Sequence, residues 1–313
     1  MQLFLFSGIS FSSISFLVSA VFLLPQSFRS SVIFSPLQFF ILSVFSIIGV
    51  DKMFKLGISS SCFYPVETEI AFDKVCLTGC KYAELFICAP SELEEAFVKQ
   101  IKEKADSAGV QIIAVHPFTS FMENTFLFSP YIRRFNDSIP LYKRYFEICR
   151  LFGANILTLH GAKDICSIPD EEHFRRFALL SDIGREYGVT LCQENVVHFK
   201  AQTADYLERM SNAVGENFGI TLDIKQARRA GADAQDIIDR LSPFIKHIHL
   251  SDFNDEKDCI PPCSGKYNFE ALFSKLKSVG YDGGLIIELY NHSYKEESEV
   301  KDSFNALNLM LNL

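Results

Sequence analysis

The chain has 313 residues, 48% of them hydrophobic, which is enough for one large domain with an appendage or for two small domains. Its net charge of −8 and isoelectric point near 5.4 argue against a general nucleic-acid binder, which would carry a basic face. Nine scattered cysteines indicate reduced thiols in the cytoplasm, because neither a disulfide framework nor a paired zinc spacing is present in the sequence.

Residues 1–52 differ in composition from everything that follows. They contain two long apolar stretches, each close to the length that crosses a bilayer, and few charged side chains. This segment is either a membrane anchor or a mis-called start, that is, translated sequence upstream of the real protein. Because a strand-like run follows Met53 directly, we favour a domain over residues 53–313 that begins at Met53 and is cytoplasmic. The protein would be membrane-anchored only if residues 1–52 are genuine.

From Met53 onward one unit repeats, in which an apolar strand is followed by a polar loop, an amphipathic helix and usually a glycine. The expected strands lie, in chain order, within residues 55–59, 82–86, 111–115, 156–159, 190–197, 219–223, 245–252 and 285–288. The expected helices are residues 67–77, 92–108, 137–152, 170–187, 203–214, 233–241, 268–279 and 297–311. Strict alternation of eight strands with eight helices predicts a (β/α)8 TIM barrel, preceded by an apolar N-terminal segment outside the barrel.

Two further features bear on the fold. A doubly wound open sheet is the alternative architecture, but the first strand is followed by serines from Ser59 and not by a glycine-rich phosphate turn. The loop expected over residues 117–136 is long and rich in phenylalanine, as lids and binding elements are. Its aromatic rings could equally fill a satellite core.

Four successive apolar strands each end in a side chain able to bind a metal ion. The strand ends deliver, in order, Glu194, Asp223, His249 and Glu288. A carboxylate on an apolar strand is costly unless it is paired or metal-bound, and the segments around these carboxylates (residues 192–197, 221–224 and 286–290) contain no basic residue. The sequence therefore predicts one divalent ion at this rim. One imidazole with three carboxylates favours Mn²⁺ or Mg²⁺, with Co²⁺ or Zn²⁺ as alternatives.

Three more polar residues, Glu84, His116 and His160, come from the second, third and fourth strands. Each alone could be a hydrogen-bonded core residue, but together they favour a pocket-lining, substrate-binding role at the same rim. His247 lies two residues before His249 on the same face of its strand, one layer deeper. We interpret His247 as a satisfied barrel histidine.

The sequence resembles the xylose-isomerase-like barrel superfamily, and within it the sugar phosphate isomerase/epimerase group. The resemblance extends from Met53 to about Tyr294. The motifs that carry it lie at residues 192–195, 221–223, 247–252, 261–265 and 283–288. It implies that Glu194, Asp223, His249 and Glu288 hold one divalent metal ion. It also implies that Glu194 and Glu288 exchange protons with a sugar.

The sequence departs from the family pattern at positions that concern substrate. The family often has a substrate-contacting histidine where Gln226 stands, so the resemblance makes Gln226 a substrate-binding candidate and changes the hydroxyl pattern it would recognise. The epimerases place an arginine at the position of Asp255. In the apurinic endonuclease branch, residues at the positions of His116 and His160 bind a second metal. The third metal site of that branch lacks its histidines here.

We therefore predict a metal-dependent isomerase or epimerase that removes a proton next to a carbonyl through an enediolate. Its substrate would be a small polyhydroxylated carbonyl compound, and no nucleic-acid partner is expected. The alternatives are an inosose-dehydratase-like lyase, an apurinic-endonuclease-like hydrolase and, least favoured, a non-catalytic sugar-binding barrel. The sequence leaves open which sugar is used and whether the protein forms a homo-oligomer.

Overall fold

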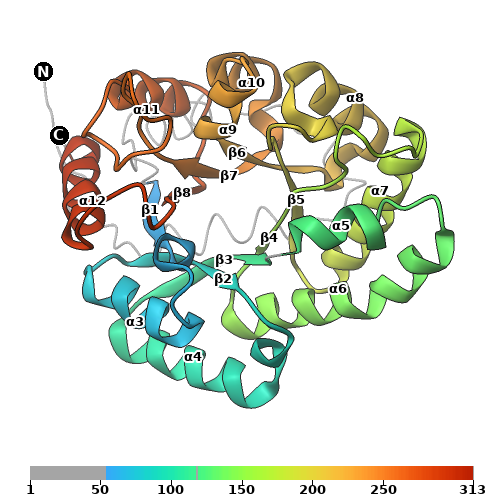
Figure 1. The fold of residues 1–313 in the computed structure, drawn as a ribbon, viewed down its shortest axis with the longest axis horizontal. Helices are drawn as coiled ribbons and strands as arrows, with labels where there is room; N and C mark the ends of the chain where they lie inside the picture. The colour runs from blue at the N-terminus through green and yellow to red at the C-terminus, as the bar shows by residue number, and fades with distance from the viewer. Residues whose placement is uncertain (1–53, 118, 313) are drawn as a thin grey trace, which may run out of the picture. The chain divides into compact units, whose positions relative to one another are not determined.

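A closed barrel of eight parallel strands forms the centre of the described part of the chain (Figure 1). The computed structural model describes residues 54–117 and 119–312. The strands are β1 (Lys55–Ser59), β2 (Tyr82–Ile87), β3 (Gln111–Pro117), β4 (Ile156–Leu159), β5 (Thr190–Glu194), β6 (Gly219–Asp223), β7 (Ile245–Leu250) and β8 (Gly284–Ile287). Each strand pairs with the next in the chain, and β1 also pairs with β8. The predicted TIM barrel is therefore confirmed.

Helices surround the barrel on its outside (Figure 1). The α-helices are α3 (Thr68–Leu77), α4 (Glu95–Ala108), α5 (Ser120–Phe126), α6 (Ile132–Phe152), α7 (Asp170–Glu186), α8 (Ala204–Val214), α9 (Ile224–Arg229), α10 (Ala234–Leu241), α11 (Phe269–Ser278) and α12 (Ser298–Leu311). The short 3-10 helices are η2 (Ser60–Phe63), η3 (Pro90–Leu93), η4 (Lys200–Gln202), η5 (Gly215–Asn217) and η6 (Ser242–Phe244).

Helix α4 illustrates how the sequence specifies these elements. Its buried residues Val98, Ile101 and Ala105 are three and four positions apart, so they share the face that packs on the barrel. The helix ends where Gly109 adopts the left-handed conformation, with φ of 68°. The strands are buried on both faces, as β4 shows along its whole length, because the helices cover the barrel outside and side chains fill it inside.

The structure differs from the sequence prediction over residues 117–136, where a loop was expected. This stretch contains α5 and the start of α6, which continues through Pro140. Phe128 and Phe135 are fully buried and form part of the core, whereas Phe126 at the end of α5 is 38% exposed. The burial of Phe135 stabilises the first turn of α6, in a stretch with weak local signals. A second difference is α9, a short helix that follows Asp223 directly.

The expectations about residues 1–52 fall outside the described residues. No helix in the described part of the chain is both long and apolar enough to cross a membrane.

Candidate metal centre at the carboxyl-terminal rim of the barrel

The four predicted metal ligands come together at one end of the barrel. Glu194 and Asp223 are the last residues of β5 and β6, His249 lies near the end of β7, and Glu288 directly follows β8. One ligand atom from each of the four lies within 4.8 Å of the others. They meet because parallel barrel strands direct all their carboxyl ends to the same rim.

Two atoms in this cluster have no hydrogen-bond partner although they are buried. They are Asp223 Oδ2 and His249 Nδ1. His249 Nδ1 lies 3.7 Å from Glu194 Oε1 and 3.4 Å from Glu288 Oε2, so the imidazole nitrogen faces the carboxylates. A buried polar atom without a partner is costly unless a ligand satisfies it. Three carboxylates and one imidazole converging in this way fit a divalent ion.

Glu84 lies beneath this cluster. Its carboxylate is fully buried, and its Oε2 lies 3.0 Å from His247 Nε2 and 3.1 Å from His249 Nε2. Burial alone would raise the pKa of Glu84, but the two imidazoles outweigh burial and hold that pKa well below its usual value. The pair Glu84–His249 therefore occupies the Nε2 atom and leaves the Nδ1 atom for the centre.

His247 has room beside β8 because residue 284 is a glycine. A Cβ atom at Gly284 would lie 2.8 Å from His247 Nδ1. The expectation that His247 is a satisfied barrel histidine agrees with its bond to Glu84 through Nε2, whereas its Nδ1 atom has no hydrogen-bond partner.

His116 and His160 lie on the other side of Glu194. Glu194 Oε2 is 3.4 Å from His116 Nε2 and 3.1 Å from His160 Nε2, and the two nitrogens are 3.1 Å apart. Burial alone would lower the pKa of His116, but its bond to Glu194 and the surrounding carboxylates raise it to about 9. Glu194 therefore directs Oε1 towards His249 and Oε2 towards this histidine pair.

Lys225 was missed by the sequence reasoning. Asp223 is the N-cap of α9, its Oδ1 accepts a hydrogen bond from the Gln226 N–H, and this turn places Lys225 in the centre. Lys225 Nζ lies 3.1 Å from Asp223 Oδ2 and 3.2 Å from Glu288 Oε2. Burial alone would lower the pKa of Lys225, but the two carboxylates raise it well above its ordinary value.

The three segments around the carboxylates contain no basic residue, but the inference that Asp223 and Glu288 therefore lack a basic partner was wrong. The segment 221–224 at the end of β6 stops one residue before the lysine. A lysine in the first turn of a helix that follows a ligand was the available signal. The contact between Lys225 and Asp223 Oδ2 is an ion pair at 3.1 Å without hydrogen-bond geometry, so this oxygen still has no hydrogen-bond donor.

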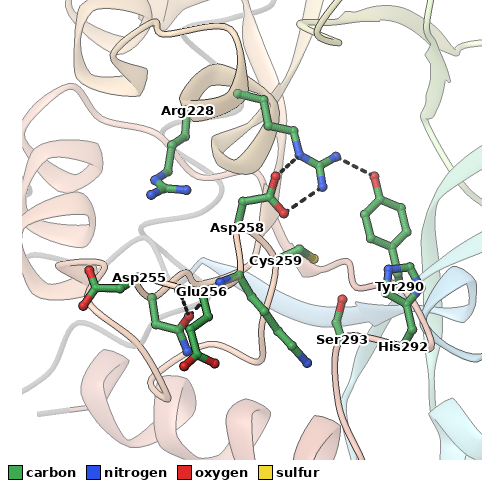
Figure 2. Close-up of a pocket in the computed structure, with 11 residues that line it drawn as sticks. Arg228, Asp255, Glu256, Asp258, Cys259, Tyr290, His292 and Ser293 are labelled. Atoms are coloured by element: carbon green, nitrogen blue, oxygen red, sulfur yellow. Dashed lines mark hydrogen bonds and ion pairs between the residues drawn. The ribbon is translucent and has the colours of Figure 1, made fainter.

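A cavity of about 500 Å³ lies beside Tyr290, and none of the four predicted ligands lines it (Figure 2). Its walls come from α9, from residues 254–259 after β7 and from residues 290–293 after β8. Arg229 donates hydrogen bonds to Asp258 at 2.6 Å and to the Tyr290 hydroxyl at 2.9 Å. Figure 2 marks these contacts of Asp258 and Tyr290 with dashed lines. The ring of Tyr290 also faces Lys225 Nζ at 4.7 Å. Tyr290 therefore contacts the cavity on one side and the cluster through Lys225 on the other.

The pattern of the family described as Xylose isomerase-like TIM barrel matches residues 72–310. The chain belongs to the xylose isomerase-like TIM barrel family. This confirms the resemblance at the level of the family and the fold.

The chain is also similar to individual proteins and to solved structures. An uncharacterized protein of Methanocaldococcus jannaschii is 23% identical over 269 residues, covering 81% of this chain and 90% of that protein. Inosose isomerase of Bacillus velezensis is 26% identical over 174 residues, covering 51% of this chain and 62% of the isomerase. The crystal structure of a D-tagatose 3-epimerase-like protein, at 20% identity, superposes with a TM-score of 0.69 over 82% of this chain and 98% of that one. This last likeness concerns the fold.

Gln226, which the resemblance made a substrate-binding candidate, has a structural contact. Gln226 is buried, and its Oε1 accepts a hydrogen bond from the Val197 N–H at 3.3 Å. Asn195 makes a similar connection, because its side-chain amide exchanges two hydrogen bonds with the Asp223 backbone, at 3.0 and 2.7 Å. Both amides hold the end of β5 to the start of α9. Substrate binding by Gln226 stays a prediction.

Proposed function

We propose that this protein is a divalent-metal-dependent sugar isomerase or epimerase. The observation that carries the proposal is the convergence of three carboxylates and one imidazole at the rim, with Asp223 Oδ2 and His249 Nδ1 buried and without hydrogen-bond partners. The family, the isomerase relative and the epimerase-like fold neighbour support it. The substrate would be a small polyhydroxylated carbonyl compound.

The proposed ligands of the ion are Glu194, Asp223, His249 and Glu288, with Mn²⁺ or Mg²⁺ as the preferred metal. When bound, the ion would supply positive charge that stabilises the negative oxygen developing as a neighbouring C–H proton leaves. Glu84 would not touch substrate in this arrangement, because it is fully buried below His249. It would hold the imidazole with Nδ1 towards the ion.

Glu194 and Glu288 would transfer the protons. They come from β5 and β8, which are separated around the barrel, so a substrate could lie between them. Burial would raise the pKa of each, but the neighbouring histidines, together with Lys225 in the case of Glu288, hold both pKa values below the ordinary one. Both groups are therefore carboxylates at neutral pH and able to accept a proton.

The exposed members of the cluster indicate where substrate enters. The side chains of His160 and Glu288 are 21% and 14% exposed, whereas that of Glu194 is 2% exposed. His160 would then donate or accept a hydrogen bond with a sugar hydroxyl. The cavity beside Tyr290 offers space for the part of the sugar that does not react.

A hydrolase is the second candidate, and one observation favours it. His116, His160 and Glu194 form a second group of possible ligands, and these three residues would hold a second ion. Two ions in such an arrangement activate water and stabilise a leaving oxygen. Two tightly bound ions per chain would therefore favour hydrolysis over isomerisation.

Deuterium exchange tests the proposal. The wild type, loaded with Mn²⁺ and incubated in D₂O with a panel of ketoses and their phosphates, should place deuterium at the carbon next to the carbonyl. Glu288→Gln and Glu194→Gln should each reduce the exchange roughly 100-fold or more, because an amide cannot act as the base. Glu172→Gln, which alters a carboxylate on α7 paired with Arg176, is the matched control and should exchange like the wild type.

Exchange that persists unchanged in both centre variants would overturn the assignment of the acid and base. Release of water or phosphate without isotope exchange would move the protein to the lyase or the hydrolase alternative.

A further inference from the structure

Lys225 contacts the two carboxylate oxygens that an ion would need. Its Nζ lies 3.1 Å from Asp223 Oδ2, the buried oxygen without a hydrogen-bond donor. It also lies 3.2 Å from Glu288 Oε2, the oxygen that faces His249 Nδ1 at 3.4 Å. An incoming divalent ion would therefore meet an ammonium that already occupies part of its ligand set.

The ammonium is confined to this place. The Lys225 side chain is 2% exposed, and the face of the Tyr290 ring lies 4.7 Å from Nζ. An aromatic face attracts a cation, so Tyr290 stabilises the ammonium beside the two carboxylates. Because α9 begins at Ile224 and is capped by Asp223 itself, the backbone of Lys225 is held beside the centre.

The positive charge of Lys225 has opposite effects on the metal-free centre and on metal binding. Without an ion, the carboxylates of Glu194, Asp223 and Glu288 are buried close together and repel one another. A fixed positive charge reduces that repulsion, which stabilises the empty centre. The same charge repels a divalent ion and competes with it for two oxygens, which weakens binding.

We propose that Lys225 is a resident cation that holds the empty centre together and lowers its affinity for the divalent ion. This inference rests on the metal centre of the proposed function. The lowered affinity would let the bound ion exchange, so that the fraction of chains that hold an ion follows the concentration of free metal. Lys225 is in this sense a positioning residue, since it acts through Asp223 and Glu288.

Titration calorimetry with Mn²⁺ and thermal melting in EDTA test the inference together. Lys225→Met keeps the length of the side chain and removes its charge. It should bind Mn²⁺ roughly tenfold or more tightly than the wild type, and its metal-free melting temperature should fall by roughly 5–10 °C. The melting-temperature gain on adding Mn²⁺ should accordingly be larger in the variant.

Two further variants separate charge from packing. Lys225→Arg retains a cation, so its Mn²⁺ affinity should stay closer to that of the wild type than the affinity of Lys225→Met does, because charge sets the effect. Lys200→Met removes a lysine paired with Asp170 away from the centre and should leave Mn²⁺ affinity unchanged. If Lys225→Met does not fold without metal, Lys225→Gln gives the same comparison with a neutral polar side chain.

An affinity for Mn²⁺ that is equal to or weaker than that of the wild type in Lys225→Met and Lys225→Gln would overturn the inference, even while the wild type still exchanges deuterium. If neither the wild type nor these variants bind Mn²⁺, the inference and the proposed metal centre fail together. If the wild type binds Mn²⁺ and the lysine variants behave as expected, but no sugar exchanges deuterium, the inference stands and the proposed reaction fails alone.

Discussion

At the scale of single residues, Glu84 decides how His249 faces the rim. A histidine offers two nitrogens, and the hydrogen bond made by one determines what the other can do. Glu84 Oε2 is hydrogen-bonded to His249 Nε2 at 3.1 Å, and the other nitrogen, Nδ1, faces the carboxylates of the centre. The same oxygen also bonds His247, so one buried carboxylate holds two imidazoles.

Glu84→Gln should weaken Mn²⁺ binding by roughly 10- to 100-fold, because the amide lacks the charge that orients and polarises His249. Calorimetric titration with Mn²⁺ measures this. Glu147→Gln, which alters an exposed carboxylate paired with Arg144, is the control and should bind as the wild type does. If Glu84→Gln kept its metal affinity and raised only the KM for sugar, Glu84 would contact substrate, as the sequence predicted.

At the scale of elements, the contact between α7 and α8 contains a buried histidine that is not part of the metal centre. His173 on α7 is fully buried, and its Nδ1 lies 2.8 Å from the Tyr206 hydroxyl of α8. Its ring meets Phe128 edge to face, with centroids 4.5 Å apart. Burial, reinforced by Lys200, lowers the pKa of His173 to about 3.

This histidine should make the protein sensitive to acid. In the unfolded chain His173 takes up a proton near pH 6.5, whereas in the folded protein it stays neutral down to about pH 3. The contribution of the neutral His173 to the free energy of unfolding is therefore complete above pH 6.5 and is lost as the pH falls below that value. Between pH 7 and pH 5 the wild type should lose about 2 kcal/mol more unfolding free energy than His173→Phe. Urea unfolding at both pH values measures the difference.

The variant keeps an aromatic ring against Phe128, and the Tyr206 hydroxyl keeps Asp170 as a partner at 3.3 Å. Equal losses of unfolding free energy in the wild type and in His173→Phe would contradict the low pKa.

At the scale of the whole molecule, none of the described contacts that close the barrel involves a residue before Phe54. The first strand pairs with both β2 and β8, and the Lys55 N–H donates to the Gly283 carbonyl at 3.1 Å. The eight-stranded ring is complete with these pairings. We therefore propose that the barrel over residues 53–313 is an independent folding unit.

A chain that begins at Met53 should be soluble, melt in a single cooperative transition and melt at a higher temperature with Mn²⁺. Differential scanning calorimetry of this chain with and without the ion measures all three properties. The full-length chain in the same buffer is the comparison. Insolubility of the shorter chain, with the full-length chain stable only in detergent, would identify residues 1–52 as a membrane element.

The sequence by itself determined the order of the strands and the four strand-end residues. Both depend on local patterns, since an apolar run that ends in Glu194 or Asp223 is readable within a few residues, and parallel strands necessarily share one rim. It also indicated the helix ends at glycines such as Gly109. The predicted start of α6 was wrong. The first turn of this helix is stabilised by the burial of Phe135 in the core, and the local sequence carries no signal for it.

Only the tertiary structure decided which charges face the four ligands. Glu84 meets His249 because β2 and β7, far apart in the sequence, lie on one closed barrel with their side chains directed inwards. Lys225 has a long side chain whose direction no local pattern specifies. It points into the centre because Asp223 caps α9 and because Glu288, brought there by β8, supplies the second carboxylate. The pairing of Glu84 with His249 and that of Lys225 with Glu288 depend on barrel closure, and the distance along the chain hides both from the sequence. The pairing of Lys225 with Asp223 spans two residues and had a local signal, the lysine in the first turn of α9.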